Sequence, residues 1–153
     1  MELRIIAVGG IKESFIREGI AEYVKRMKPL AKISILEVPE SNNGPGALCL
    51  KTEGKAILEQ LRKDHFTIAL AIQGRSVDSI GLADLLSDAV TYRASTIDFI
   101  IGGSLGLDAS VLESSDVLLS FSKLTFPHQL MRLILVEQIY RSMKINRNEP
   151  YHK

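Results

Sequence analysis

The strongest constraint on the fold is a regular alternation of two hydrophobic patterns along the chain. The first segment, residues 3–8, is apolar at nearly every position, which is typical of a strand that is buried on both faces. The second segment, residues 12–28, carries apolar residues at the three- and four-residue spacing of one helical face, and Pro29 ends it. Those apolar positions are Phe15, Ile16, Ile20, Val24 and Met27. The chain is therefore expected to begin with a strand that is followed by a helix.

The same two patterns repeat to the C-terminus and predict an α/β fold. Further strands are expected over residues 33–38, 66–72, 97–101 and 117–121, and further helices over residues 48–63, 82–90, 108–114 and 128–145. Ser79 is the expected cap of the helix over residues 82–90, because a serine oxygen accepts hydrogen bonds from the free amides of a first turn. Since the strands are continuously apolar, we expect a mostly parallel sheet flanked by helices, in one domain over residues 1–153.

Composition argues against several classes of protein. The chain is 46% hydrophobic and 24% charged, which fits an ordinary globular protein and argues against disorder. The single cysteine, Cys49, cannot form an internal disulfide, and its apolar neighbours favour packing over catalysis. The three histidines and this cysteine lack metal-ligand spacing, so no metal site is expected. No segment resembles a signal peptide or approaches the roughly 18 apolar residues of a membrane span, which predicts a cytoplasmic protein.

Positive charge gathers toward the C-terminus, although the whole chain carries a net charge of only +1. From residue 123 onward the basic residues are Lys123, Arg132, Arg141, Lys144, Arg147 and Lys153, against the acids Glu137 and Glu149. A basic end can bind a phosphate backbone, but the same charges also suit a solvated tail. Charge alone leaves both interpretations open. Residues 151–153 lie outside the apolar pattern and are not expected to support the fold.

The last predicted helix, over residues 128–145, is apolar around most of its circumference. Its apolar residues are Leu130, Met131, Leu133, Ile134, Leu135, Val136, Ile139, Tyr140 and Met143. A helix of this kind is buried on more than one side. The sheet can cover one side, and we expect a second copy of the chain to cover another in a symmetric homodimer. Enclosure of the helix within one copy is the alternative.

One edge of the predicted sheet is the expected functional edge, because ligands bind beyond the carboxyl ends of parallel strands. Gly9-Gly10, Gly74 and Gly102-Gly103 follow strands and should lie there, either to let the main chain approach a ligand or only to form tight turns. Residues 120–129 combine main-chain amides, hydroxyls and apolar side chains, and such a stretch could hold a flat heterocycle. Residues 102–106 have neither the spacing of a dinucleotide fingerprint nor the lysine of a phosphate-binding loop.

Four motifs, in this order, closely resemble the SPOUT methyltransferase family. They are Ile101-Gly102-Gly103 with Gly106-Leu107, residues 119–129, Glu137-Gln138-Ile139-Tyr140-Arg141, and Pro150-Tyr151-His152-Lys153. The resemblance runs from Ile6-Ala7-Val8-Gly9 to the C-terminus. It implies a C-terminal trefoil knot, a homodimer, and S-adenosylmethionine as a cofactor that is bound in the knot. The residues that it places around this cofactor are Leu70, Gly103, Phe121, Ser122, Lys123, Leu124, Thr125 and Phe126.

The resemblance further implies methylation of N3 of a pseudouridine, at position 1915 of 23S ribosomal RNA, on the assembled ribosome. The imide N3 carries a proton that must leave, and His152 is the candidate to assist. Tyr151 is a candidate to stack on the base. Arg141, with Arg132, is a candidate to hold a phosphate or the charge that develops on a base carbonyl. His128 is expected to order the cofactor loop.

Two other functions stay open at this point. The chain could be a non-catalytic RNA- or ribosome-binding module of the same fold, which would bind ribosomes without transferring a methyl group. It could also be a different small-molecule enzyme on a similar sheet, because a fold does not determine a function. The C-terminal Tyr151-His152 argues against the small-molecule enzyme, since a buried site for a small substrate seldom uses a chain terminus.

Overall fold

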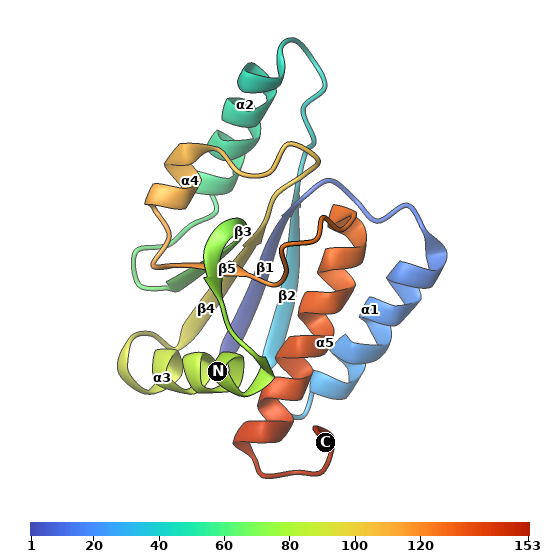
Figure 1. The fold of residues 1–153 in the computed structure, drawn as a ribbon, viewed down its shortest axis with the longest axis vertical. Helices are drawn as coiled ribbons and strands as arrows, with labels where there is room; N and C mark the ends of the chain where they lie inside the picture. The colour runs from blue at the N-terminus through green and yellow to red at the C-terminus, as the bar shows by residue number, and fades with distance from the viewer.

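The computed structural model describes residues 1–153 and shows a five-stranded sheet between two layers of helices (Figure 1). The elements are β1 (Glu2–Val8), α1 (Ser14–Met27), β2 (Lys32–Val38), α2 (Gly46–Leu58), β3 (Phe66–Ser76), α3 (Ser79–Tyr92), β4 (Thr96–Ile101), α4 (Ala109–Glu113), β5 (Val117–Ser120) and α5 (His128–Asn146). All strands are parallel, in the spatial order β2-β1-β4-β3-β5. The predicted parallel sheet with flanking helices is confirmed, and the trefoil knot stays a prediction.

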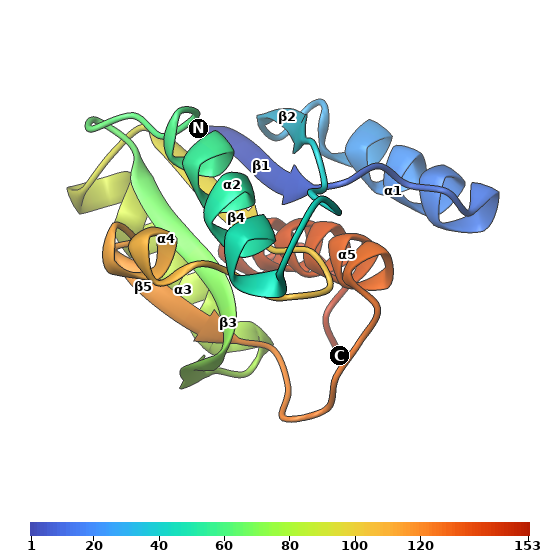
Figure 2. The ribbon, with the colours of Figure 1, turned by 90° about the horizontal axis from the view of Figure 1, so that it is seen from above.

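Alternate side chains of β1 enter two separate hydrophobic cores. Leu3, Ile5 and Ala7 point into the larger core, which α1, α3 and α5 cover. Ile6 and Val8 point into the smaller core, which α2 and α4 cover. Figure 2 shows α1 and α5 together on one side of the twisted sheet. Because helices cover both faces, the central strands β1 and β4 have almost no solvent-facing side, and this is why their apolar pattern is nearly continuous.

Helix α5 lies between α1 and α3 and packs against both (Figure 1). Leu135 and Ile139 are fully buried, whereas Leu130, Met131 and Ile134 near the start of the helix stay half-buried. One copy of the chain therefore encloses much of this helix, and the start of α5 is the part with surface left for a second copy. The homodimer stays a prediction. Neither α5 nor any other helix combines the length and the apolar character needed to cross a membrane.

Strand β3 continues past the point where the sequence predicts its end. The prediction of a strand over residues 66–72 is wrong at its C-terminal side, because β3 continues through Gln73-Gly74 to Ser76. Its register with β5 shifts between Leu70 and Arg75, so that both residues pair with Leu119. The four residues between them form a bulge. A side chain on Gly74 would lie 2.6 Å from main-chain atoms of the facing strand, which is why glycine occupies this position.

The predicted C-terminal ends of a helix and of another strand also differ from the structure. The helix predicted over residues 48–63 ends at Leu58, because the chain then folds into tight turns, one of which joins the Leu61 amide to the Leu58 carbonyl at 3.2 Å. Leu61 still packs against the smaller core, so the apolar pattern extends beyond the helix. Strand β5 ends at Ser120 rather than at Phe121.

The cap of α3 is Asp78 and not Ser79. A carboxylate oxygen of Asp78 accepts a hydrogen bond from the Gly81 amide at 2.7 Å. Ser79 is already the first helical residue, and its hydroxyl donates to the Gln138 side-chain oxygen on α5 at 2.8 Å. The prediction of Ser79 as the cap is therefore wrong. Both residue types can cap a helix, and the position of the first turn relative to α5 decides which one does.

Asp78→Ala is expected to lower the free energy of unfolding by about 1 kcal/mol, because the Gly81 amide loses its acceptor. Asp78→Asn keeps a capping oxygen and should stay within a few tenths of a kcal/mol of the parent protein. Urea unfolding at one protein concentration measures both. A free energy of unfolding for Asp78→Ala equal to that of the parent protein would show that the cap contributes nothing.

Candidate functional site

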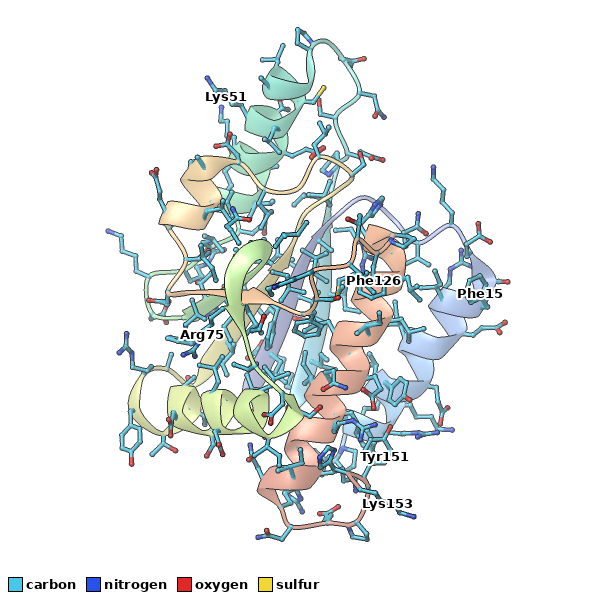
Figure 3. All side chains as sticks on the ribbon, in the orientation of Figure 1. Phe15, Lys51, Arg75, Phe126, Tyr151 and Lys153 are labelled. Atoms are coloured by element: carbon cyan, nitrogen blue, oxygen red, sulfur yellow. The ribbon has the colours of Figure 1, made fainter.

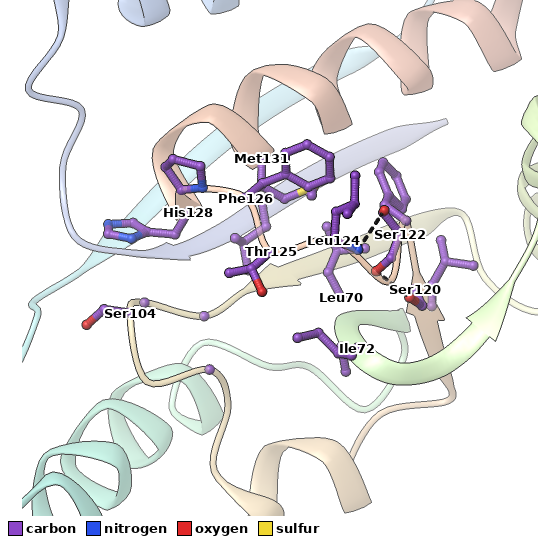
Figure 4. A pocket seen from close by; sticks show the side chains of 18 residues that line it. Leu70, Ile72, Ser104, Ser120, Ser122, Leu124, Thr125, Phe126, His128 and Met131 are labelled. Atoms are coloured by element: carbon purple, nitrogen blue, oxygen red, sulfur yellow. Dashed lines mark hydrogen bonds between the residues drawn. The ribbon is translucent and has the colours of Figure 1, made fainter.

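A cavity of about 570 Å³ opens at the carboxyl edge of the sheet. Figure 4 shows its walls, which come from three chain segments. The lining residues include Leu70, Ala71 and Ile72 at the bulge of β3, Gly102, Gly103, Ser104 and Gly106 after β4, and residues 119–122, residues 124–128 and Met131 at and beyond the end of β5. Because β3 lies between β4 and β5 in the sheet, the carboxyl ends of these strands meet at one place.

Most of the residues predicted to surround the cofactor line this cavity. They are Leu70, Gly103, Phe121, Ser122, Leu124, Thr125 and Phe126. Lys123 is exposed and does not line the cavity. The structure therefore brings together seven of the eight predicted residues, from three segments that are distant in the sequence. Their role in cofactor binding stays a prediction.

Sequence reasoning missed several residues that line the cavity. Ile72 enters it from the bulge of β3, Ser104 from the loop after β4, and Met131 from the first turn of α5. Gly74 is the local signal that could have indicated the bulge, since an isolated glycine inside a strand often marks one. No local pattern distinguishes Met131 from the other apolar positions on the last helix.

The stretch after β5 leaves main-chain polar groups free beside apolar walls. The amides of Lys123, Thr125 and Phe126 donate no hydrogen bond within the chain. The amide of Leu124 donates to the Ser122 hydroxyl oxygen at 2.9 Å, which bends the stretch into a tight turn. Apolar walls with a few free main-chain amides suit a flat heterocycle with polar edges.

A thin turn of main chain forms the wall after β4. The Gly106 amide donates to the Gly103 carbonyl at 3.0 Å, and Gly106 has a φ of +82°, in the left-handed region that favours glycine. A Cβ on Gly102 would lie 2.3 Å from the Gly106 carbonyl oxygen. The turn therefore requires glycine at position 102 because two stretches of main chain touch there.

His128 and Arg132 sit one turn apart at the start of α5 but differ in surroundings. His128 lines the cavity. Arg132 is 1% exposed, and it donates to a Glu37 carboxylate oxygen at 2.6 Å and to the Gly9 carbonyl at 2.8 Å. A guanidinium enclosed in this way ties α5 to β1 and β2 and cannot reach an RNA phosphate, so the phosphate role predicted for Arg132 is wrong. The chain has no group of three or more His, Cys, Asp or Glu side chains that could hold a metal ion.

The three predicted catalytic residues lie together at the other end of α5. Arg141 Nη1 is 3.2 Å from His152 Nδ1, and the guanidinium carbon of Arg141 is 4.7 Å from the centre of the Tyr151 ring. Figure 3 shows Tyr151 beside the end of α5, away from Phe126 at the cavity. Arg141 follows His128 by 13 positions. At 1.5 Å per residue this is about 20 Å along the helix, so the three residues lie far from the cavity of their own copy.

Tyr151 packs on the larger core and is not a loose tail residue. Its ring meets the Tyr140 ring edge-on, with 4.8 Å between ring centres. Its hydroxyl donates to Glu137 Oε1 at 3.0 Å and lies 3.4 Å from the Tyr23 hydroxyl. Burial, followed by these hydrogen bonds, raises the pKa of Tyr151 well above the usual range of a phenol, so the group stays neutral. The expectation that residues 151–153 do not support the fold is therefore wrong for Tyr151.

Comparison with known proteins places the whole chain in one group. A family model described as a predicted SPOUT methyltransferase matches residues 1–152. Relatives named ribosomal RNA large subunit methyltransferase H match over the full length of both chains. They come from Carboxydothermus hydrogenoformans (49% identical), Bifidobacterium adolescentis (49%) and Bacillus pumilus (47%).

A solved structure shares the fold. It is described as the structure of a probable methylase family protein from Haemophilus influenzae, and it matches 99% of this chain and 70% of its own length. Its TM-score is 0.58 at 15% identity, so this likeness concerns the fold alone. The family model and the full-length relatives show the family as well as the fold. This chain belongs to the SPOUT methyltransferase family.

Proposed function

We propose that this chain is an S-adenosylmethionine-dependent methyltransferase that acts on large-subunit ribosomal RNA. The target that we propose is N3 of the pseudouridine at position 1915 of 23S RNA, on the assembled ribosome. One observation carries the proposal: seven of the eight residues that the resemblance assigns to the methyl donor line one cavity, although they come from three distant segments. The name of the relatives points to the same class of substrate. Residues 1–153 would act as one catalytic domain, in the cytoplasm where the ribosomal substrate is.

The cavity fits the chemical parts of S-adenosylmethionine. Leu70, Phe126 and Met131 offer apolar surface to an adenine ring, and the free amides of Thr125 and Phe126 are donors for its nitrogens. When bound, this cofactor supplies a methyl group on a positively charged sulfur, which is a strong electrophile. The main task of the chain is therefore to hold the RNA nitrogen in line with that methyl group.

Arg141 and His152 are the polar groups that we propose to contact the base. A hydrogen bond to Glu137 raises the pKa of Arg141 above its already high usual value, so the guanidinium is always charged. A fixed positive charge stabilises the negative charge that spreads to the base carbonyls when N3 loses its proton. His152 is exposed at the end of the chain and free to reach RNA.

A homodimer would bring these polar groups to a cavity. Arg141 and His152 lie about 20 Å along α5 from the cavity of their own copy, so another copy has to supply them. Apolar side chains surround the mouth of the cavity: Ile72 is 65% exposed and Leu124 is 71% exposed. Together with the half-buried start of α5, they form a surface that a second copy would cover.

Mass spectrometry of ribosomal RNA tests the proposal directly. Ribosomes that lack the modification are incubated with the protein and labelled S-adenosylmethionine, and the RNA is then digested. We expect one labelled methyl group on the pseudouridine. Label on another nucleotide would overturn the proposed target. Ribosome binding that is indifferent to the cofactor, without any label, would instead support the non-catalytic RNA-binding module.

His152→Ala is expected to lower the single-turnover rate of methyl transfer by about 10²-fold or more, because the base loses a polar partner in the transition state. The affinity for S-adenosylhomocysteine, measured by calorimetry, should stay unchanged, since His152 contacts the base and not the donor. Lys153→Ala is the neighbouring control and should keep the parent rate. A parent-like rate for His152→Ala would remove this residue from the site.

A further inference from the structure

Glu137 gathers hydrogen bonds from the residues that we place beside the RNA base. Its Oε1 atom accepts from Arg141 Nη2 at 2.7 Å, from Arg141 Nε at 3.1 Å and from the Tyr151 hydroxyl at 3.0 Å. Its Oε2 atom accepts from the Gln138 side-chain amide at 2.7 Å. The Glu137 side chain is 18% exposed and that of Arg141 is 24% exposed, so water competes little for these contacts. The carboxylate therefore connects the last helix to the C-terminal segment.

These contacts fix the orientation of the Arg141 guanidinium. Two of its nitrogens are held by one oxygen of Glu137, and the Tyr151 ring lies against it with 4.7 Å from the guanidinium carbon to the ring centre. A planar guanidinium that is hydrogen-bonded along one edge and packed on one face can rotate little. The remaining nitrogen, Nη1, lies 3.2 Å from His152 Nδ1.

The direction of the hydrogen bond between Arg141 and His152 follows from chemistry. A guanidinium has donors and no acceptor, so His152 Nδ1 must be the acceptor and carries no hydrogen. The hydrogen of the neutral ring is then on Nε2, the nitrogen that points away from Arg141. We propose that Glu137 is a positioning residue that, through Arg141, makes His152 present Nε2–H to the RNA base as a hydrogen-bond donor and not as a base.

This inference rests on the proposed function and assigns His152 a defined part in it. The N3 proton leaves to water, and the negative charge that remains is shared with the two carbonyl oxygens beside N3. The electron pair of N3 then forms the bond to the methyl carbon, while the carbon–sulfur bond breaks and its electrons stay on sulfur. His152 Nε2–H donates to one of the carbonyl oxygens, and the Arg141 cation lies directly behind the ring. Glu137 touches neither reactant and acts only through Arg141.

Nitrogen NMR of the free protein tests the tautomer without any catalysis. Ring ¹⁵N resonances of His152 should show hydrogen on Nε2 and an Nδ1 atom that accepts a hydrogen bond. In Arg141→Met the Nδ1 resonance should move to the position of a free imidazole nitrogen, and in Glu137→Gln it should move part of the way. Glu149→Gln is the matched control, because Glu149 pairs with Lys144 and Arg147 and not with Arg141. Hydrogen on Nδ1 in the parent protein would overturn the proposal.

Single-turnover rates of His152 variants show whether His152 acts as a hydrogen-bond donor or as a base. A glutamine amide can donate near the position of Nε2–H but cannot take up a proton. We expect His152→Gln to keep the single-turnover rate within about 10-fold of the parent, whereas His152→Ala loses about 10²–10³-fold. Equally slow glutamine and alanine variants would show that His152 is a base. Glu137→Gln should lower kcat by about 10-fold or more with little change in KM, since it disturbs position and not binding.

The two measurements separate the failure of this inference from failure of the proposed function. If the parent protein leaves ribosomal RNA unlabelled, the proposed function fails, while the NMR result still decides the state of His152. If the RNA is labelled but the Nδ1 resonance is the same in the parent protein, Glu137→Gln and Arg141→Met, the positioning role of Glu137 is wrong. Calorimetry with S-adenosylhomocysteine checks that each variant keeps an intact cavity.

Discussion

Gly102→Ala is expected to weaken S-adenosylhomocysteine binding by about 10- to 10²-fold, because overpacking costs about 1–3 kcal/mol and each 1.4 kcal/mol is about tenfold in affinity. The added Cβ would lie 2.3 Å from the Gly106 carbonyl oxygen and 2.6 Å from the Gly106 carbonyl carbon. Both are main-chain atoms of the same turn, so no side chain can rotate away to make room. The turn has to open, and with it the wall that Gly103 and Ser104 contribute to the cavity. Calorimetry measures the change in affinity.

The matched control for this substitution is Gly46→Ala. A Cβ at Gly46 has only ordinary contacts, the nearest at 3.9 Å from the flexible Leu105 side chain. This variant should bind the ligand as the parent protein does. Thermal unfolding accompanies both measurements, since overpacking at Gly102 should also cost about 1–3 kcal/mol of stability. Parent-like affinity for Gly102→Ala would show that the turn after β4 is not part of the binding site.

Asp98→Ala is expected to lower the free energy of unfolding by about 3–5 kcal/mol, the usual loss when one partner of a buried ion pair is removed. Asp98 on β4 is fully buried. Its two oxygens accept from Arg4 Nε and Nη2 at 2.7 Å each, and His65 Nδ1 lies 3.0 Å away. Without the carboxylate, the Arg4 charge would stay largely enclosed, with the Gln60 carbonyl as its remaining partner. Urea unfolding at one protein concentration measures the loss.

An exposed ion pair between β1 and β2 is the control. Lys32 Nζ lies 3.1 Å from Glu2 Oε1, and the side chains of Glu2 and Lys32 are 34% and 75% exposed. Glu2→Ala should therefore cost less than about 1 kcal/mol. Similar small losses for Asp98→Ala and Glu2→Ala would show that burial adds nothing to the Asp98 contacts. Asp98→Asn, which keeps one acceptor, should fall between the two and serves if the alanine variant does not fold.

Much of the fold could be predicted because its signals are local. The continuous apolar runs at β1 and β4 indicate strands that are covered on both faces, and Pro29 marks the chain just beyond α1. The cap of α3 could not be predicted in the same way, because adjacent Asp78 and Ser79 are both good capping residues. Contact of Ser79 with Gln138 on α5 decides between them, and α5 is distant in the sequence.

The candidate site also has parts that local sequence patterns predict and parts that depend on contacts between distant residues. Glycines after β4 and the stretch after β5 carry recognisable patterns, so their place at the functional edge was predictable. Gly74 is a local signal for a bulge in β3. The register of the bulge was not predictable, since it depends on Leu70 and Arg75 pairing with the same residue of β5. Burial of Arg132 was not predictable either, because its partners Glu37 and Gly9 come from other strands and loops.

By itself, the sequence determined the order of strands and helices and the segments that end at the functional edge, because apolar spacing and turn residues act over a few neighbouring positions. Only the tertiary structure decided that β3 lies between β4 and β5, which joins three segments in one cavity, and that Glu137, Arg141, Tyr151 and His152 meet about 20 Å from it along α5. The physical reason is that strand order and helix packing are set by contacts between distant residues, and no local pattern encodes those contacts.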